Sequence, residues 1–154
     1  MRLMKLALVV TLVAAAYGVQ AQADPTVGTW KLNLAKSKYN AGQPPKSSTV
    51  IIAAAGQGIK LTSDTVLADG TARKISYTAT YDGKDAVVTG TPDYDGMSLK
   101  KTANGLEGSR KKAGKVVQTY TRVVSADGKT MTVTSTGTTA AGAKVDNVQV
   151  YDKQ

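Results

Sequence analysis

The chain has 154 residues, a formal net charge of +9, and neither histidine nor cysteine. This composition excludes disulfides, thiol nucleophiles, the usual general base and the side chains that most often bind zinc or copper. Glu107 is the only glutamate, and no serine lies in a Gly-x-Ser-x-Gly motif. The composition therefore predicts a protein that is not an enzyme and that uses no metal or cofactor.

The first 23 residues have the order of a secretory signal peptide. Arg2 and Lys5 precede an apolar run over residues 6–16, and the small-residue sequence Ala21-Gln22-Ala23 follows. We expect cleavage after Ala23, which leaves residues 24–154 as one domain in the periplasm or outside the cell. The apolar run is shorter than the roughly 20 residues that span a bilayer, so we expect no transmembrane segment after cleavage.

The remainder of the chain is rich in Val, Ile, Thr and Tyr, with turn dipeptides at short intervals. Pairs suited to tight hairpin turns are Asp69-Gly70, Asp82-Gly83, Asp95-Gly96, Asn104-Gly105 and Asp127-Gly128. The segments between turns predict about ten short strands, at residues 27–34, 48–55, 58–66, 71–81, 84–90, 96–102, 106–112, 116–124, 129–137 and 144–152. Residues 35–47, with two adjacent prolines, are expected to form a loop across one end of the sheet.

These strands predict an all-β fold, an antiparallel up-and-down meander of about eight to ten strands. A meander of this length in a small domain is expected to close into a barrel, because closure removes exposed strand edges.

The turn at Asp82-Gly83 indicates which side chains of its hairpin face the interior. A two-residue turn there places Tyr77 opposite Val88 and Ala79 opposite Ala86, on an apolar face. Tyr77 and Ala79 are therefore expected to point inward.

The turn at Asp127-Gly128 predicts that an arginine of its hairpin faces the interior. A two-residue turn places Arg122 opposite Val133, with Tyr120 on the same face, whereas the other face is rich in threonine. Arg122 is then an inward arginine, which is costly unless a carboxylate, a carbonyl, an aromatic ring or a bound anion satisfies it.

The next hairpin allows two registers. A two-residue turn at Ala113-Gly114 would place Glu107 and Lys111 on the Tyr120 face and turn two leucines outward. A three-residue loop that also includes Lys115 gives a better core. We expect this loop, so Arg110 should point inward or lie at the rim.

Two short motifs carry a resemblance to a known group. Gly28-Thr29-Trp30 resembles the G-x-W motif of lipocalins, and Gln149-Val150-Tyr151 resembles the last strand of fatty-acid-binding proteins. With its meander, the chain resembles the calycin superfamily, including small exported bacterial proteins of lipocalin type. The resemblance implies a lipocalin-like barrel that Trp30 closes against a basic side chain from a late strand, for which Arg122 is a candidate. The family's Arg-x-Tyr pair holds a ligand carboxylate, but Gln149 stands at the position of that arginine.

The leading hypothesis is a barrel that binds a small apolar or amphipathic molecule. Arg110 and Arg122 would meet an anionic end, because a buried guanidinium needs an anion or a network of acceptors. The remaining candidate contacts are Tyr77, Tyr120, Gln149 and Tyr151. The register of the last strand stays open, since either Gln149 and Tyr151 or Val148 and Val150 face inward. A cavity of roughly 300 Å³ or more would favour this hypothesis.

The alternative is an envelope protein with a filled interior and a basic surface. We expect a basic band on two neighbouring strands and the adjoining loop, formed by Lys100, Lys101, Arg110, Lys111, Lys112 and Lys115. This band would dock on anionic glycans or lipid headgroups, although lysines there also serve solubility and the protection of strand edges. Nucleic acid is not expected as a partner, because the compartment rarely offers it.

Overall fold

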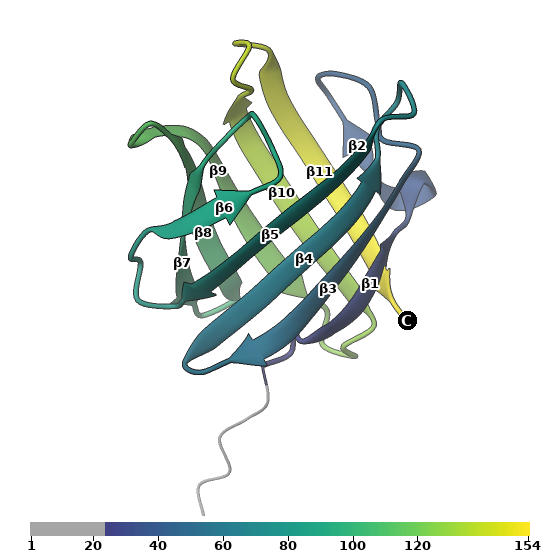
Figure 1. The fold of residues 1–154 in the computed structure, drawn as a ribbon. Helices are drawn as coiled ribbons and strands as arrows, with labels where there is room; N and C mark the ends of the chain where they lie inside the picture. Colours follow the sequence, from purple (N-terminus) through teal and green to yellow (C-terminus); the bar gives the residue numbers. More distant parts are fainter. Residues whose placement is uncertain (1–23) are drawn as a thin grey trace, which may run out of the picture.

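The structure is a computed structural model and describes residues 24–154. The expected signal peptide therefore lies outside the described residues. The described chain forms one antiparallel sheet of 11 strands that curves into a barrel (Figure 1). In chain order the elements are β1 (Gly28–Leu32), the 3-10 helix η1 (Leu34–Lys36), β2 (Lys38–Tyr39), β3 (Ser47–Ala55), β4 (Gly58–Val66), β5 (Ala72–Thr80), β6 (Ala86–Thr89), β7 (Gly96–Thr102), β8 (Gly105–Lys112), β9 (Lys115–Val124), β10 (Thr130–Thr138) and β11 (Lys144–Lys153).

The barrel closes where the last strand meets the first. From β3 to β11 each strand pairs with its neighbour in sequence, and β1 pairs with both β3 and β11. β2 also pairs with β11, farther along that strand, with Tyr39 beside Asn147. β1 and β2 therefore pair with successive parts of β11, and η1 lies between them in the chain. The predicted all-β meander and its closure are confirmed.

The first predicted strand and the predicted loop need correction. The strand expected at 27–34 ends at Leu32, because the Asn33 side chain accepts a hydrogen bond from the Lys36 backbone N–H (3.1 Å) and caps η1. The segment expected to be a loop contains both η1 and β2.

The barrel wall between β5 and β7 has fewer paired residues than the predicted hairpin. The expected register is correct, with Tyr77 beside Val88, but β6 pairs with each neighbour at only two positions. Gly83 donates its backbone N–H to Leu99 O (2.9 Å) instead of closing a regular hairpin with Tyr81. Tyr77 and Ala79 are buried, as predicted.

The hairpin of β9 and β10 has the predicted register. Arg122 lies beside Val133 and Tyr120 beside Ser135, and all four side chains are buried in the barrel. Thr121 lies on the outer face and is exposed.

The predicted three-residue loop between β8 and β9 is wrong. Lys112 pairs with Lys115 across a two-residue turn whose residues, Ala113 and Gly114, both have positive φ (48° and 77°). That conformation matches the twist of antiparallel hairpins. A bulge then shifts the register by one residue beyond Arg110, which restores the predicted inner face.

The interior is divided into an apolar end and a polar end. Trp30, Ile52, Ile59 and Leu99 are almost completely buried at the end where β1 begins. Toward the other end several buried side chains are polar, namely Ser48, Ser63, Gln118 and Ser135. The polar end is therefore where a ligand with hydrogen-bonding groups would be held.

Trp30 is buried at the apolar end, and the basic side chain over its ring is not the expected arginine. Its Nε1 donates a hydrogen bond to Thr26 O (2.8 Å), and the Lys153 Nζ lies 5.1 Å from its ring centroid. Lys153 follows Tyr151 on β11, opposite Trp30, so the last strand supplies the basic side chain. Arg122 lies deeper and instead faces Tyr120.

Asp24 ties the start of the described chain to this apolar end. Its carboxylate accepts hydrogen bonds from Thr26 and from the hydroxyl of Tyr81. Burial alone would raise the pKa of Asp24, but these hydrogen bonds outweigh it and hold the pKa below its ordinary value. The ionised form therefore stabilises the fold.

We expect stability to be nearly independent of pH between about 5 and 7 and to fall below about pH 4. The chain has no histidine to titrate in the neutral range. The pKa of Asp24 is lower in the folded state, and hydrogen bonds from Thr80 and Lys84 lower that of Asp82 to about 2. Their stabilisation is present above the unfolded pKa and is lost as pH falls through the folded pKa.

Urea denaturation at a series of pH values tests this expectation. D24N should reduce the loss of unfolding free energy at low pH, whereas D64N, which removes an exposed ion pair with Lys74, should not. A marked change in unfolding free energy between about pH 5 and 7 would contradict the expectation.

Candidate functional site

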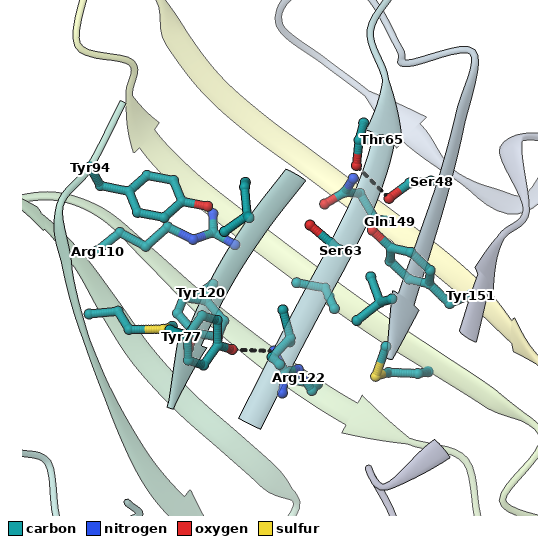
Figure 2. Close-up of a pocket in the computed structure, with 16 residues that line it drawn as sticks. Ser48, Ser63, Thr65, Tyr77, Tyr94, Arg110, Tyr120, Arg122, Gln149 and Tyr151 are labelled. Carbon is teal, nitrogen blue, oxygen red and sulfur yellow. Dashed lines mark hydrogen bonds between the residues drawn. The ribbon is translucent and has the colours of Figure 1, made fainter. Parts of the chain in front are cut away.

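A cavity of about 200 Å³ lies in the barrel interior, away from Trp30. Six of its lining residues are apolar, namely Val50, Leu61, Ile75, Met97, Met131 and Val133. The other ten are polar or aromatic, namely Ser48, Ser63, Thr65, Tyr77, Tyr94, Arg110, Tyr120, Arg122, Gln149 and Tyr151 (Figure 2). The lining has two arginines and no carboxylate. The cavity is smaller than the roughly 300 Å³ typical of drug-sized pockets, so only a small ligand, or part of a larger one, fits within it.

Arg122 is the most unusual side chain in the cavity. It is 5% exposed, and one guanidinium nitrogen, Nη2, donates to the Tyr77 hydroxyl (3.1 Å). Its Nε and Nη1 have no hydrogen-bond partner within residues 24–154, and no carboxylate of that range forms an ion pair with it. A buried cation with free donors is costly, so this group favours an anionic or strongly accepting ligand.

The charge on Arg122 persists despite its burial. Burial opposes the charged form, whereas the hydrogen bond to the Tyr77 hydroxyl favours it, and the pKa of Arg122 lies above its ordinary value. Burial also raises the pKa of Tyr120, with a further contribution from Tyr77. Arg122 is therefore a cation and Tyr120 a neutral phenol at physiological pH.

Tyr120 supplies another free donor. Its buried hydroxyl has no partner in the described part of the chain. The ring can lie against β8 because Gly108 is opposite it, where an added Cβ would come within 2.6 Å of the ring. Tyr120 and Arg122 thus present three unpaired donor atoms to one region of the interior.

Arg110 lies inside the barrel toward the polar end, as predicted. Its Nη1 donates to Gln118 Oε1 (2.7 Å) and Ser135 Oγ (3.3 Å). The guanidinium also lies over the rings of Tyr120 (4.7 Å) and Tyr94 (5.2 Å). One nitrogen of Arg110 is therefore hydrogen-bonded to neutral groups, and its charge remains available to attract an anion.

The sequence left two registers possible for the last strand, and the structure shows which one is present. Tyr151 pairs with Met131 and Gln149 with Val133, so both side chains face the cavity. Burial raises the pKa of Tyr151 to about 12, and its hydroxyl stays protonated. Val150 is also buried, but on the other face, where its backbone N–H donates to Ser37 Oγ (2.9 Å).

Four cavity residues, Ser48, Ser63, Thr65 and Tyr94, were not predicted. Ser48 lies two residues before Val50 on the inner face of β3, and Ser63 pairs with Val50 from β4. The alternation of β3 was a usable signal for Ser48. No local pattern identified Tyr94, which follows β6 in a turn-rich segment.

The predicted basic band is not continuous. Lys111 pairs with Gly96 and Lys100 with Glu107, so these lysines lie toward opposite ends of the hairpin of β7 and β8. Two of the lysines at the β8 end, Lys111 and Lys112, form ion pairs with Asp85 (2.7 Å) and Asp95 (3.6 Å). At the other end, the Lys101 ammonium lies over the Tyr81 ring (4.4 Å). Lys115 is exposed beside the turn.

Two features are absent from the described residues. Within 24–154, no cluster of three or more histidine, cysteine or acidic side chains is arranged to hold a metal ion. The same stretch contains no helix of the length and apolar character needed to cross a membrane.

The closed antiparallel meander, with a buried tryptophan near the start of β1, is the calycin barrel fold. Among solved structures, the chain is similar to the zebrafish ileal bile acid-binding protein complexed with cholic acid, with a TM-score of 0.50 and 14% identity. The match covers 84% of this chain and 99% of the zebrafish chain. No family model matches the sequence, and no curated protein does. The similarity therefore concerns the fold.

Proposed function

We propose that this protein is a non-catalytic barrel that binds a small amphipathic anion. Arg122 and Tyr120 would hold the anionic group, and the apolar side chains of the cavity would contact the remainder. The observation that carries the proposal is the buried Arg122, whose Nε and Nη1 have no partner within residues 24–154. Charge-assisted hydrogen bonds to an anion would satisfy both the charge and these donors.

Two features support an amphipathic anion over a neutral ligand. The cavity lining contains two arginines and no acidic side chain. Arg110 adds a second positive charge near Tyr120. The zebrafish protein of the same fold was solved with cholic acid, an amphipathic carboxylic acid, although the present cavity favours a smaller compound.

Location is part of the same proposal and rests on the sequence of residues 1–23. Export to the periplasm or beyond would expose the barrel to small anions of the envelope or the medium. The envelope-docking alternative has less support, because its lysines are divided between two ends of a hairpin and two of them are paired with aspartates.

Calorimetric titration of the delipidated protein with hexanoate and with hexanol tests the proposal. These two ligands have the same chain length and differ in charge. We expect saturable binding of hexanoate, at least about tenfold tighter than that of hexanol, because charge-assisted hydrogen bonds are stronger than neutral ones.

Native mass spectrometry of the protein purified from its source complements the titration, and an anionic small molecule should accompany the barrel. Equal affinity for hexanoate and hexanol, or no saturable binding of either, would contradict the proposal.

A further inference from the structure

A second hollow, of about 480 Å³, adjoins the cavity at the polar end of the barrel. We call it the outer chamber. Its wall includes β2, the segment before β3, the turn after β4 and the connection between β10 and β11. Thr65 and Gln149 line both the outer chamber and the inner cavity. The two spaces are therefore neighbours, with these side chains at their boundary.

The boundary is made of hydrogen-bonded side chains. Gln149 Nε2 on β11 donates to the Tyr39 hydroxyl on β2 (3.1 Å), and Tyr39 lines the outer chamber. On the other side, the hydroxyls of Ser48 and Thr65 lie 2.8 Å apart and form a hydrogen bond. A partition of this kind opens by side-chain rotation, with no change in the sheet.

The outer chamber suits the apolar part of a ligand. Its wall includes Pro45, Leu67, Ala68 and Val145, and the charged side chains Asp69, Arg73 and Lys144 also line it. Arg122 and Gln149 both line the inner cavity, on β9 and β11, with Val133 of β10 paired between them (Figure 2). An apolar chain that starts at Arg122 and outgrows the inner cavity would therefore reach Gln149.

We infer that Gln149 and Tyr39 form a partition that limits the length of ligand that the inner cavity holds by itself. This inference rests on the proposed function, because it takes the anionic group to be held at Arg122. Short anions occupy the inner cavity alone. Longer ones displace the Gln149 amide from Tyr39 and extend between the side chains of Gln149 and Thr65 into the outer chamber, at the cost of one hydrogen bond.

The test is a series of straight-chain carboxylates from hexanoate to dodecanoate, titrated into the wild type, Y39F and Q149L. Both variants remove the hydrogen bond of the partition, and neither introduces a charge. We expect dodecanoate to bind each variant about three- to tenfold more tightly than the wild type, the equivalent of one net hydrogen bond. Hexanoate affinity of Y39F should change by less than about twofold, because Tyr39 does not line the inner cavity.

K38Q is the matched control. Lys38 is the other residue of β2, it is exposed, and it pairs with Val148 without lining either space. The variant should bind both carboxylates as the wild type does.

An unchanged dependence on chain length in both Y39F and Q149L would overturn the inference, as would an equal change for hexanoate and dodecanoate. Failure of the wild type to bind a carboxylate of any length would instead refute the proposed function.

Discussion

Replacing Arg122 with methionine is expected to weaken hexanoate binding by at least about 100-fold, the effect of truncating one member of a buried charge pair. The same variant should increase the free energy of unfolding by about 1 kcal/mol or more, because it removes a buried charge without a charged partner. Methionine has a similar length and fills irregular space in a core. The lost hydrogen bond to Tyr77 acts in the opposite direction, but the about 1.5–3 kcal/mol of a hydrogen bond to a charged group is smaller than the several kcal/mol that burial of an ion without a charged partner costs.

Calorimetry and urea denaturation of the same R122M preparation give the two values. K60M is the control, since it removes a positive charge from the exposed outer face of β4 and should alter neither value appreciably. Destabilisation by R122M with unchanged anion binding would show that Arg122 has a structural role.

Replacing Trp30 with alanine is expected to lower the free energy of unfolding by about 3–5 kcal/mol, as for other large-to-alanine changes in cores. Trp30 is fully buried, donates to Thr26 O and is covered by Lys153. Such a loss is a large part of the roughly 5–15 kcal/mol of a typical domain.

Because Trp30 is the only tryptophan, circular dichroism in urea must replace intrinsic tryptophan fluorescence as the probe. W30F retains a ring and should cost clearly less than W30A. Trp30 does not line the cavity, so the folded fraction of W30A should still bind hexanoate. A stability loss below about 1 kcal/mol would mean that Trp30 does not stabilise the apolar end in the way described.

The sequence predicted the faces of the central hairpins better than their turns. The register expected from a two-residue turn at Asp127-Gly128 is correct, and with it the inward direction of Arg122, although the turn itself is longer, with Gly128 donating its backbone N–H to Ser125 O. Between β8 and β9, a three-residue loop and a two-residue turn followed by a bulge place Arg110 on the same face. Side-chain alternation cannot distinguish these two arrangements, because both shift the register by one residue.

The part of the site that the sequence missed comes from segments without a strong pattern. Tyr39 lies in β2, a two-residue strand inside a segment that contains prolines and looked irregular. Ser48 and Ser63 occupy inner positions of β3 and β4, where apolar residues are the usual expectation. The orientation of Gln149 depended on the pairing of β10 with β11, which the sequence near Gly142 did not determine.

The predicted basic band failed for another reason. Two residues on neighbouring strands need not be close in space. In an antiparallel pair the end of one strand lies beside the start of the next, so residues near the ends of both strands are far apart. Lys100 and Lys111 are separated in this way.

The most direct test of the anion-binding proposal is an experimental structure of the protein with hexanoate bound. We predict a carboxylate oxygen within about 2.7–3.2 Å of Arg122 Nε or Nη1, with the apolar chain inside the barrel. A structure in which hexanoate lies outside the barrel while Arg122 is satisfied entirely by protein acceptors would contradict that proposal.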